Sequence, residues 1–184
     1  LLTGPSDPPL SDEAPFETVI DAAGIHYRKL AAQRRVVSAL PAIEPILEQA
    51  GMARAKSDWD GALELYKKAL FLVDASDTHS QASLYAHVAE VKLAQGKSRE
   101  AVVAIREAIR LNPRDHRFHR NLGAALHELG KADDAVAAAR VALQLKPDDP
   151  LCHYLLGLLL TAQGKLDDAA AAYREAIRLK SDHA

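Results

Sequence analysis

The sequence predicts an all-α protein, an α-solenoid of about four helix-turn-helix repeats that is preceded by one extra amphipathic helix. The chain of 184 residues is 48% hydrophobic but only 5% aromatic, and much of its apolar content is Ala and Leu, which favour helices. Gly96, Gly130 and Gly164, each followed by lysine, recur at one constant spacing. Between these glycines, apolar and small residues return in the same register at helical spacing, which is typical of a helical repeat protein.

Four further kinds of position keep the same step along the chain. They are Ala101, Ala135 and Ala169; Ala108, Ala142 and Ala176; Leu111, Leu145 and Leu179; and Pro113 with Pro147. Because one pair of helices cannot bury its apolar face alone, a period of this length predicts that successive pairs stack on one another.

Each period predicts two helices. The first, such as residues 117–129, ends at a glycine that can adopt the left-handed conformation and so close the helix. The second, such as residues 133–145, carries alanines where a neighbouring helix approaches closely, and it ends before a proline that cannot continue it. The short connection makes the two helices antiparallel neighbours.

The first elements differ from the later repeats. Residues 1–14 are rich in Pro, Asp, Ser and Gly and are predicted to form a flexible tail or linker. Residues 15–38 carry apolar residues at helical spacing, with Gly24 as a weak point, and are predicted to form an amphipathic helix that caps the stack or connects to another domain. The apolar positions are Phe16, Val19, Ile20, Ala23, Tyr27, Leu30 and Ala31.

The repeat domain is predicted to span residues 43–184, with repeats at about 43–76, 82–115, 116–149 and 150–183. The step from Ala62 to Ala101 is longer than the step from Ala101 to Ala135, and the extra residues lie in the polar stretch 74–81. In the first repeat Ser57 and Asp58 replace the Gly-Lys turn, and the first helix is expected to open at Pro45.

These residues resemble the tetratricopeptide repeat over about residues 43–184. The resemblance rests on small residues at the eighth position, Ala at the twentieth and twenty-seventh, a large residue at the twenty-fourth and Pro at the thirty-second. The matching residues are Gly123 and Gly157; Ala62, Ala101, Ala135 and Ala169; Ala69, Ala108, Ala142 and Ala176; Tyr66, Ile105 and Tyr173; and Pro113 and Pro147, whereas Ala139 departs from the pattern. The resemblance implies a right-handed superhelix whose concave groove is lined by the first helix of each pair and binds a peptide or helix of a partner protein.

One stripe of each first helix is free to face this groove. The expected groove residues are Ser83, Ala86 and Glu90; Arg117, Arg120 and His127; and Leu151, Tyr154, Leu158 and Thr161. Arg117 and Arg120 either dock an acidic group of the ligand or form a solvated basic face paired with Asp115 and neighbouring acids. The Lys and Asn clamp with which one family subset grips acidic chaperone tails is absent.

The first helix of the last repeat is apolar nearly all round, from Leu151 to Leu160. Such a helix is usually covered on more than one side. We therefore expect its groove side to be covered by a partner helix, by the N-terminal helix, or by a second copy of the chain in a homo-oligomer formed through the fourth repeat.

Several classes of function are not supported. The net charge of −2 indicates no nucleic-acid partner, and no apolar run approaches the length of a membrane span. His116 and His119 lack the further ligands of a metal site, and the lone Cys152 is interpreted as a packing residue, so no metal, cofactor or catalytic group is assigned. The compartment is undetermined, with a cytoplasmic location as the default expectation.

The predicted function is a protein–protein interaction module with a scaffold or adaptor role in a bacterial-type protein, and not an enzyme. Two alternatives remain open at this point: a regulatory or substrate-recruiting region of a larger multidomain enzyme, and a self-assembling structural unit. The Ala- and Arg-rich composition suggests the bacterial type.

Overall fold

The computed structural model describes residues 19–20, 26–27 and 40–181, and side chains from residue 43 onward. Within this part the chain forms eight helices and one pair of short strands. The helices are α1 (Leu40–Ala55), α2 (Trp59–Leu72), α3 (Thr78–Ala94), α4 (Ser98–Leu111), α5 (His116–Glu128), α6 (Ala132–Leu145), α7 (Pro150–Ala162) and α8 (Leu166–Ser181). The predicted α-solenoid is confirmed.

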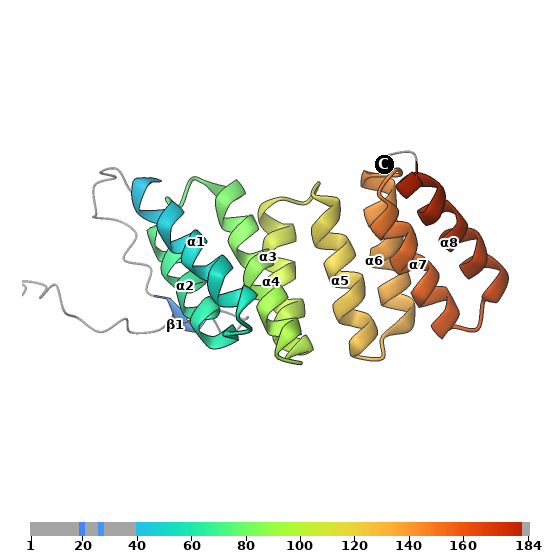
Figure 1. The fold of residues 1–184 in the computed structure, drawn as a ribbon, viewed down its shortest axis with the longest axis horizontal. Coiled ribbons are helices and arrows are strands. Elements are labelled where there is room, and N and C mark those ends of the chain that lie inside the picture. The colour runs from blue at the N-terminus through green and yellow to red at the C-terminus, as the bar shows by residue number, and fades with distance from the viewer. Residues whose placement is uncertain (1–18, 21–25, 28–39, 182–184) are drawn as a thin grey trace, which may run out of the picture.

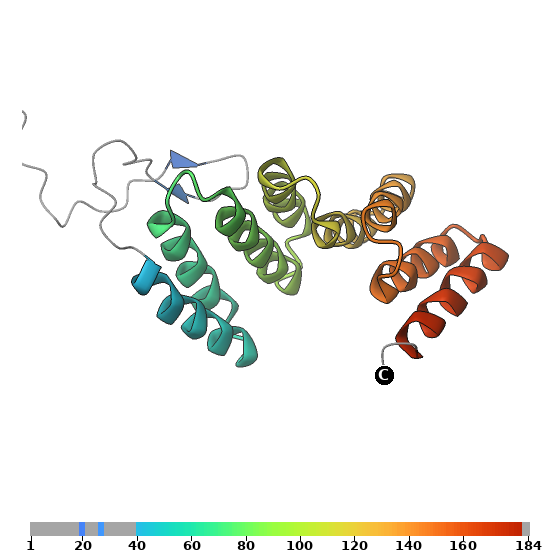
Figure 2. The ribbon, with the colours of Figure 1, turned by 90° about the horizontal axis from the view of Figure 1, so that it is seen from above.

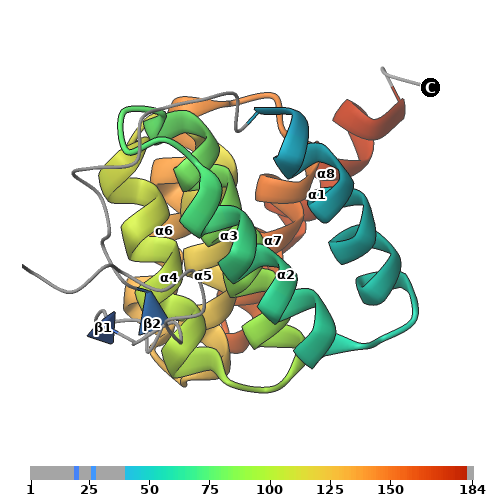
Figure 3. The same cartoon turned by 90° about the vertical axis from the view of Figure 1, so that its left-hand side faces the viewer.

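The helices pack as four antiparallel pairs, α1 with α2, α3 with α4, α5 with α6 and α7 with α8, and each pair contacts the next (Figure 1). Seen from above, the row of pairs curves along its length (Figure 2). Seen along the row from its amino-terminal end, successive pairs turn about the long axis (Figure 3). The first helices also contact one another, α3 with α5 and α5 with α7, which places them on the inner side of the curve.

Small residues let the helices approach closely within each pair. The alanines at the twentieth repeat position, Ala62, Ala101, Ala135 and Ala169, are at most 2% exposed. A Cβ atom on Gly123 would lie 3.1 Å from the carbonyl oxygen of Ala135, and one on Gly157 would lie 2.7 Å from the ring of Tyr173. The in-register small residues therefore mark contacts between helices, as expected.

The extra residues between the first and second repeats lengthen a helix. The side chain of Asp77 accepts the backbone N–H of Ser80 and caps α3, which therefore begins at Thr78 inside the polar stretch. As a result α3 has 17 residues, whereas α5 and α7 have 13 each. The inserted residues therefore extend α3 by one turn and do not form a longer loop.

Two expectations for the amino-terminal part need correction. Helix α1 begins at Leu40, so Pro45 lies inside it instead of opening it; Pro41 takes the first-turn position, where a missing amide hydrogen costs little. Of the amphipathic helix expected at residues 15–38, the structure describes four residues, and these form two antiparallel strands, β1 (Val19–Ile20) and β2 (His26–Tyr27). β-Branched and aromatic residues favour strands, and a short apolar run does not distinguish strand from helix.

The rest of segment 15–38, and the tail predicted at residues 1–14, lie outside the described residues. Their assignment as a cap or connector and as a linker stays a prediction.

The turns inside the four pairs share one backbone conformation. Gly96, Gly130 and Gly164 have φ values of +73°, +71° and +74°, and Ser57, at the equivalent position of the first repeat, has φ +59°. Glycine adopts this left-handed conformation without the steric cost that a Cβ atom brings. The first turn is therefore the least favourable of the four.

We expect Ser57→Gly to raise the free energy of unfolding by about 1 kcal/mol, because it relieves the left-handed serine. The matched control is Gly96→Ser, where a Cβ would meet no atom within 4 Å, so that only the backbone conformation changes; it should lower stability by a similar amount. Urea denaturation followed by circular dichroism measures both. Destabilisation by Ser57→Gly would contradict this account of the turn.

Candidate protein-binding groove

The expected groove residues come from the first helices α3, α5 and α7, which lie on the inner side of the stack. Glu90, Arg120 and Ser83 are partly exposed, and Arg117, His127 and Thr161 are exposed. Ala86 is only 7% exposed. Its inclusion among the groove residues therefore needs correction, because neighbouring side chains cover it.

An apolar row on α7 is an accessible part of this surface. It consists of Leu151, Tyr154 and Leu158, which are 56%, 52% and 39% exposed. Thr161 continues the row, but its hydroxyl donates to the Gly157 carbonyl at 2.8 Å. No helix of the described residues covers the row, although large apolar side chains gain free energy when they are removed from water.

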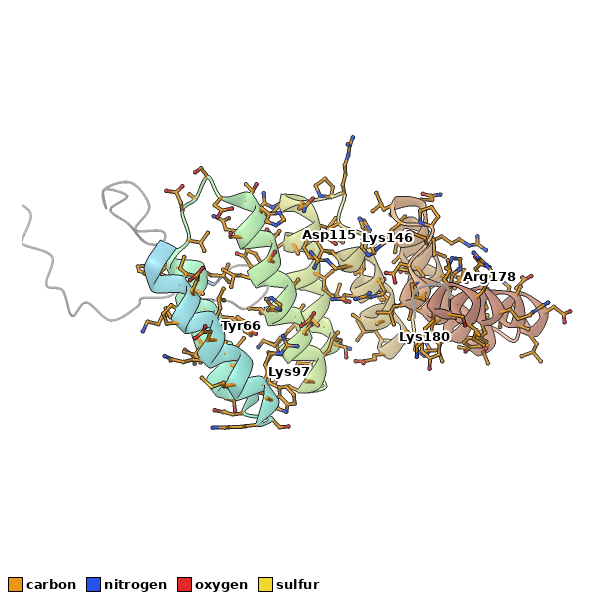
Figure 4. The ribbon with its side chains drawn as sticks, turned by 45° about the horizontal axis from the view of Figure 1, so that its top comes forward. Tyr66, Lys97, Asp115, Lys146, Arg178 and Lys180 are labelled. Atoms are coloured by element: carbon orange, nitrogen blue, oxygen red, sulfur yellow. The ribbon has the colours of Figure 1, made fainter. Side chains whose placement is uncertain are left out.

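Next to the apolar row lies a basic hollow of about 630 Å³. Its lining comes from the loop between α4 and α5, from α5, and from the loop between α6 and α7. The lining residues are Asn112, Arg114, Asp115, His116, Arg117, Arg120, Lys146 and Asp149. Figure 4 shows Asp115 and Lys146 beside each other, whereas Arg178 and Lys180 lie further along the stack on α8.

Asp115 binds one of the two arginines that the sequence singled out. Its carboxylate accepts the backbone N–H of Arg117 at 2.9 Å, and the guanidinium of Arg117 donates to it through Nε and through Nη2 at 2.6 Å. Burial alone would raise the pKa of Asp115, but the hydrogen bonds from Arg117 lower it below its usual value. Arg117 is therefore bound by Asp115, the residue that caps its own helix.

Asp149 occupies the equivalent position in the next repeat and is more buried, at 6% exposure. It accepts hydrogen bonds from the Leu151 backbone N–H at 2.9 Å and from the Cys152 thiol at 3.2 Å. Arg120 Nη1 lies 3.4 Å and His116 Nε2 3.1 Å from its Oδ2 atom. Although burial raises the pKa of Asp149, these donors and charges lower it on balance. This carboxylate joins α5 to α7 beneath the hollow.

The remaining cations of the hollow have no acidic partner among the residues that the structure describes. Within residues 43–181, neither Arg114 nor Lys146 forms an ion pair, whereas Arg117 and Arg120 do. Because two carboxylates face four side chains that stay cationic at neutral pH, the hollow carries an excess of positive charge. An anionic group would find bidentate donors there.

A second polar cluster occupies the amino-terminal part of the surface. Glu90 forms an ion pair of 2.9 Å with Arg54 of α1, and His87 Nδ1 lies 3.4 Å from the same carboxylate. The imidazole of His87 stacks on the ring of Tyr66, with centroids 5.2 Å apart. Interaction with His87 and with Arg54 holds the pKa of Glu90 below its usual value. Glu90 is thus engaged within the protein.

Sequence reasoning missed Lys146, Asp149, Arg54 and His87. Asp149 left a signal: it precedes a helix at the repeat position that Asp115 occupies one repeat earlier, and Asp is a preferred capping residue. No sequence pattern indicated Lys146, Arg54 or His87, because these residues meet their neighbours across repeats.

The groups considered for other chemistry have structural partners. His119 and His153, which share one repeat position, donate to the carbonyls of Pro113 and Pro147 at 3.0 and 2.8 Å. Cys152 is fully buried, and burial together with the hydrogen bond to Asp149 raises the pKa of its thiol to about 12. A protonated, buried thiol is a poor nucleophile. In the described part of the chain, no three potential metal ligands cluster and no helix is both long and apolar enough to cross a membrane.

Comparison with known proteins agrees with the repeat pattern. One tetratricopeptide repeat model matches residues 89–150, and another matches residues 150–183. A solved structure described as "Crystal structure of MamA" has 23% identity and a TM-score of 0.65 and covers 80% of this chain and 84% of that chain. "MamA 41-end from Desulfovibrio magneticus RS-1" has 18% identity and a TM-score of 0.65, with 76% of each chain covered. No curated protein matches the sequence.

The stacked helix pairs and their open inner surface define a helical-repeat module that binds other proteins. The chain belongs to the tetratricopeptide repeat family. Its repeats form a protein-interaction module. The likeness to the MamA structures concerns the fold, since their identities to this chain are below a quarter.

Proposed function

We propose that the inner surface binds a peptide or helix of a partner protein in which an acidic group lies beside apolar residues. The acidic group would occupy the basic hollow, and the apolar residues would cover Leu151, Tyr154 and Leu158. The observation that carries this proposal is the direct adjacency of the two surfaces: Asp149 lines the hollow and Leu151, two residues later, begins the row.

The chemistry of the two parts is complementary. The apolar row offers burial of leucine and aromatic surface, which supplies most of the affinity in protein interfaces. The hollow contributes orientation and specificity, because unpaired cations reject ligands without a negative charge near the same place. A ligand with both features is preferred over one with either feature alone.

The same observations favour binding over catalysis and a protein ligand over a nucleic acid. Cys152 is protonated and buried, His119 and His153 bond turn carbonyls, and His116 faces Asp149. The overall charge is −2. Recruitment of a substrate or regulator to a larger enzyme would use this same surface and stays an alternative. Self-association through the fourth repeat also stays a prediction, favoured by the exposed apolar side chains of α7 and α8.

The double variant Arg114→Glu with Lys146→Glu is expected to weaken binding of an acidic, leucine-containing synthetic peptide by about tenfold or more, since charge-assisted contacts are lost and like charges are introduced. These two residues are better targets than Arg117 and Arg120, whose reversal would place a carboxylate against Asp115 or Asp149. Fluorescence anisotropy across a panel of labelled peptides measures the affinities.

The control is the double variant Arg106→Glu with Arg140→Glu, which changes the net charge equally at exposed positions outside the hollow lining. It should bind nearly as well as the wild type. If both double variants lose affinity to the same extent, the effect is one of net charge and the hollow is not the acidic subsite. If the acidic peptides bind no better than neutral ones, the proposal fails.

A further inference from the structure

An apolar stripe runs along the outer side of α8, the last helix of the stack. It consists of Leu166, Ala170, Tyr173 and Ile177, whose spacing of four, three and four residues places them on one face. Leu166 and Ile177 are each 66% exposed, the highest values among the large apolar residues that the structure describes. Helix α8 lies at one end of the row of described helix pairs (Figure 1).

In the preceding second helices the positions equivalent to Ala170 and Tyr173 are buried, and those equivalent to Leu166 and Ile177 are buried or half-buried. Val102 and Ile105 of α4 are 7% and 1% exposed, and Val136 and Ala139 of α6 are 7% and 0% exposed. These helices pack against α5 and α7, the first helices of the next repeats. The α8 stripe thus has the composition of a packed face. Tyr173 is half-buried against α7, whereas no helix of the described residues covers Leu166 or Ile177.

We propose that the α8 stripe is a self-association surface, covered by the α8 stripe of a second copy of this chain in an antiparallel, two-fold arrangement. A two-fold contact uses the same surface on both copies and closes the assembly at two. Each copy then removes Leu166 and Ile177 from water together with Tyr173.

The opposite end of the stack fits the α8 stripe poorly. Helix α1 presents Pro45, Gln49 and Met52 at the positions where α3 buries Leu84, Val88 and Val91. Covering Gln49 and the exposed Glu48 beside it would remove polar groups from water without partners. Head-to-tail stacking is therefore disfavoured relative to the pairing of two α8 helices.

Charge complementarity supports the antiparallel orientation. Asp167 lies near the amino end of α8, and Arg174 lies on the same flank two turns later. In antiparallel helix pairs equal flanks meet, so Asp167 of each copy faces Arg174 of the other. Within residues 43–181 neither residue forms an ion pair; Arg174 donates only to the Ala170 carbonyl at 3.2 Å. The two helix dipoles also oppose each other in this arrangement.

The surface continues onto α7. The rings of Tyr173 and Tyr154 have centroids 5.7 Å apart, and Tyr154 is 52% exposed, whereas Arg120 and Ala86 at the equivalent positions of α5 and α3 are less exposed. The dimer contact therefore has apolar surface at its edge as well as at its centre.

Sedimentation velocity of the full chain over a range of concentrations tests the proposal. The wild type is expected to convert from monomer to dimer as concentration rises, and Ile177→Glu is expected to weaken the dimer by about tenfold or more, because it places a carboxylate in the apolar contact. The control Met52→Glu makes the same change at a residue of α1 that is 56% exposed and should leave the dimer unchanged. Circular dichroism verifies that both variants keep their helix content.

A charge exchange tests the orientation. Asp167→Arg alone should weaken the dimer, and adding Arg174→Asp should restore it, since each exchanged pair again joins opposite charges. A wild type that is monomeric at every concentration, or a mass that grows beyond two copies, overturns the proposal; so does a double variant no better than the single one. Peptide binding to the basic hollow and the apolar row, measured at concentrations at which the chain is monomeric, should be unchanged in all these variants, so that the two proposals fail separately.

Discussion

Replacing Leu159 by alanine is expected to lower the free energy of unfolding by about 2–5 kcal/mol, the cost typical of removing a buried leucine from a core that cannot collapse around the space. Leu159 is 1% exposed and belongs to the core shared by the successive helix pairs. Because each repeat of a solenoid is stabilised by its neighbours, the loss should appear first as unfolding of the fourth repeat. Urea titration followed by circular dichroism measures the free energy of unfolding.

The adjacent residue provides a matched control. Leu158 is 39% exposed in the apolar row, so Leu158→Ala should change stability far less than Leu159→Ala and should instead weaken binding of the acidic, leucine-containing peptide. The same chemical change on the same helix then separates stability from binding. Equal destabilisation by the two variants would show that the row is covered in solution.

Asp149→Ala is expected to lower the free energy of unfolding by about 1–3 kcal/mol, because it leaves several donors beneath the hollow without an acceptor. The affected donors are the Leu151 backbone N–H, the Cys152 thiol and the Arg120 guanidinium. Asp149→Asn should cost less, since an asparagine can still accept the Leu151 N–H and cap α7. The difference in the free energy of unfolding between the two variants separates the contribution of the Asp149 charge from that of its capping hydrogen bond.

The charge also predicts a dependence on pH. The pKa of Asp149 is lowered in the folded state, so its contribution is fully present above the pKa of the unfolded chain, about 3.9 for an aspartate, and is lost as pH falls through the lower folded pKa. The stability of Asp149→Asn should therefore fall less steeply below about pH 4 than that of the wild type. Other carboxyls with lowered pKa values, such as Asp115 and Glu90, contribute equally to both proteins and cancel in the comparison.

Asp148, the exposed neighbour of Asp149, supplies the control for these measurements. Asp148→Asn removes the same charge without touching the cap or the ion pairs, and it should leave both stability and its pH dependence close to those of the wild type. If the two asparagine variants behave alike, the network around Asp149 contributes no specific stability.

The repeat architecture follows from the amino-acid sequence alone. A strict period of small and apolar residues identifies helix pairs that must stack, because adjoining pairs can share one core only if Ala62, Ala101, Ala135 and their equivalents return in register. The glycines of the turns and the exposed row on α7 followed from the same register. Local rules failed where the local signal was short, since residues 19–20 and 26–27 form strands.

The chemistry of the surface depends on contacts that form only when the chain is folded. The sequence presented Arg117 and Arg120 as candidate anion-binding residues but could not show that Asp115 and Asp149 engage them, or that Arg114 and Lys146 are the cations of the hollow without an acidic partner among residues 43–181. The arrangement of charged side chains depends on atoms brought together from different repeats. A repeating pattern determines which faces pack, because packing follows from the register, whereas ion pairs form between long side chains whose ends meet only after the pairs have stacked.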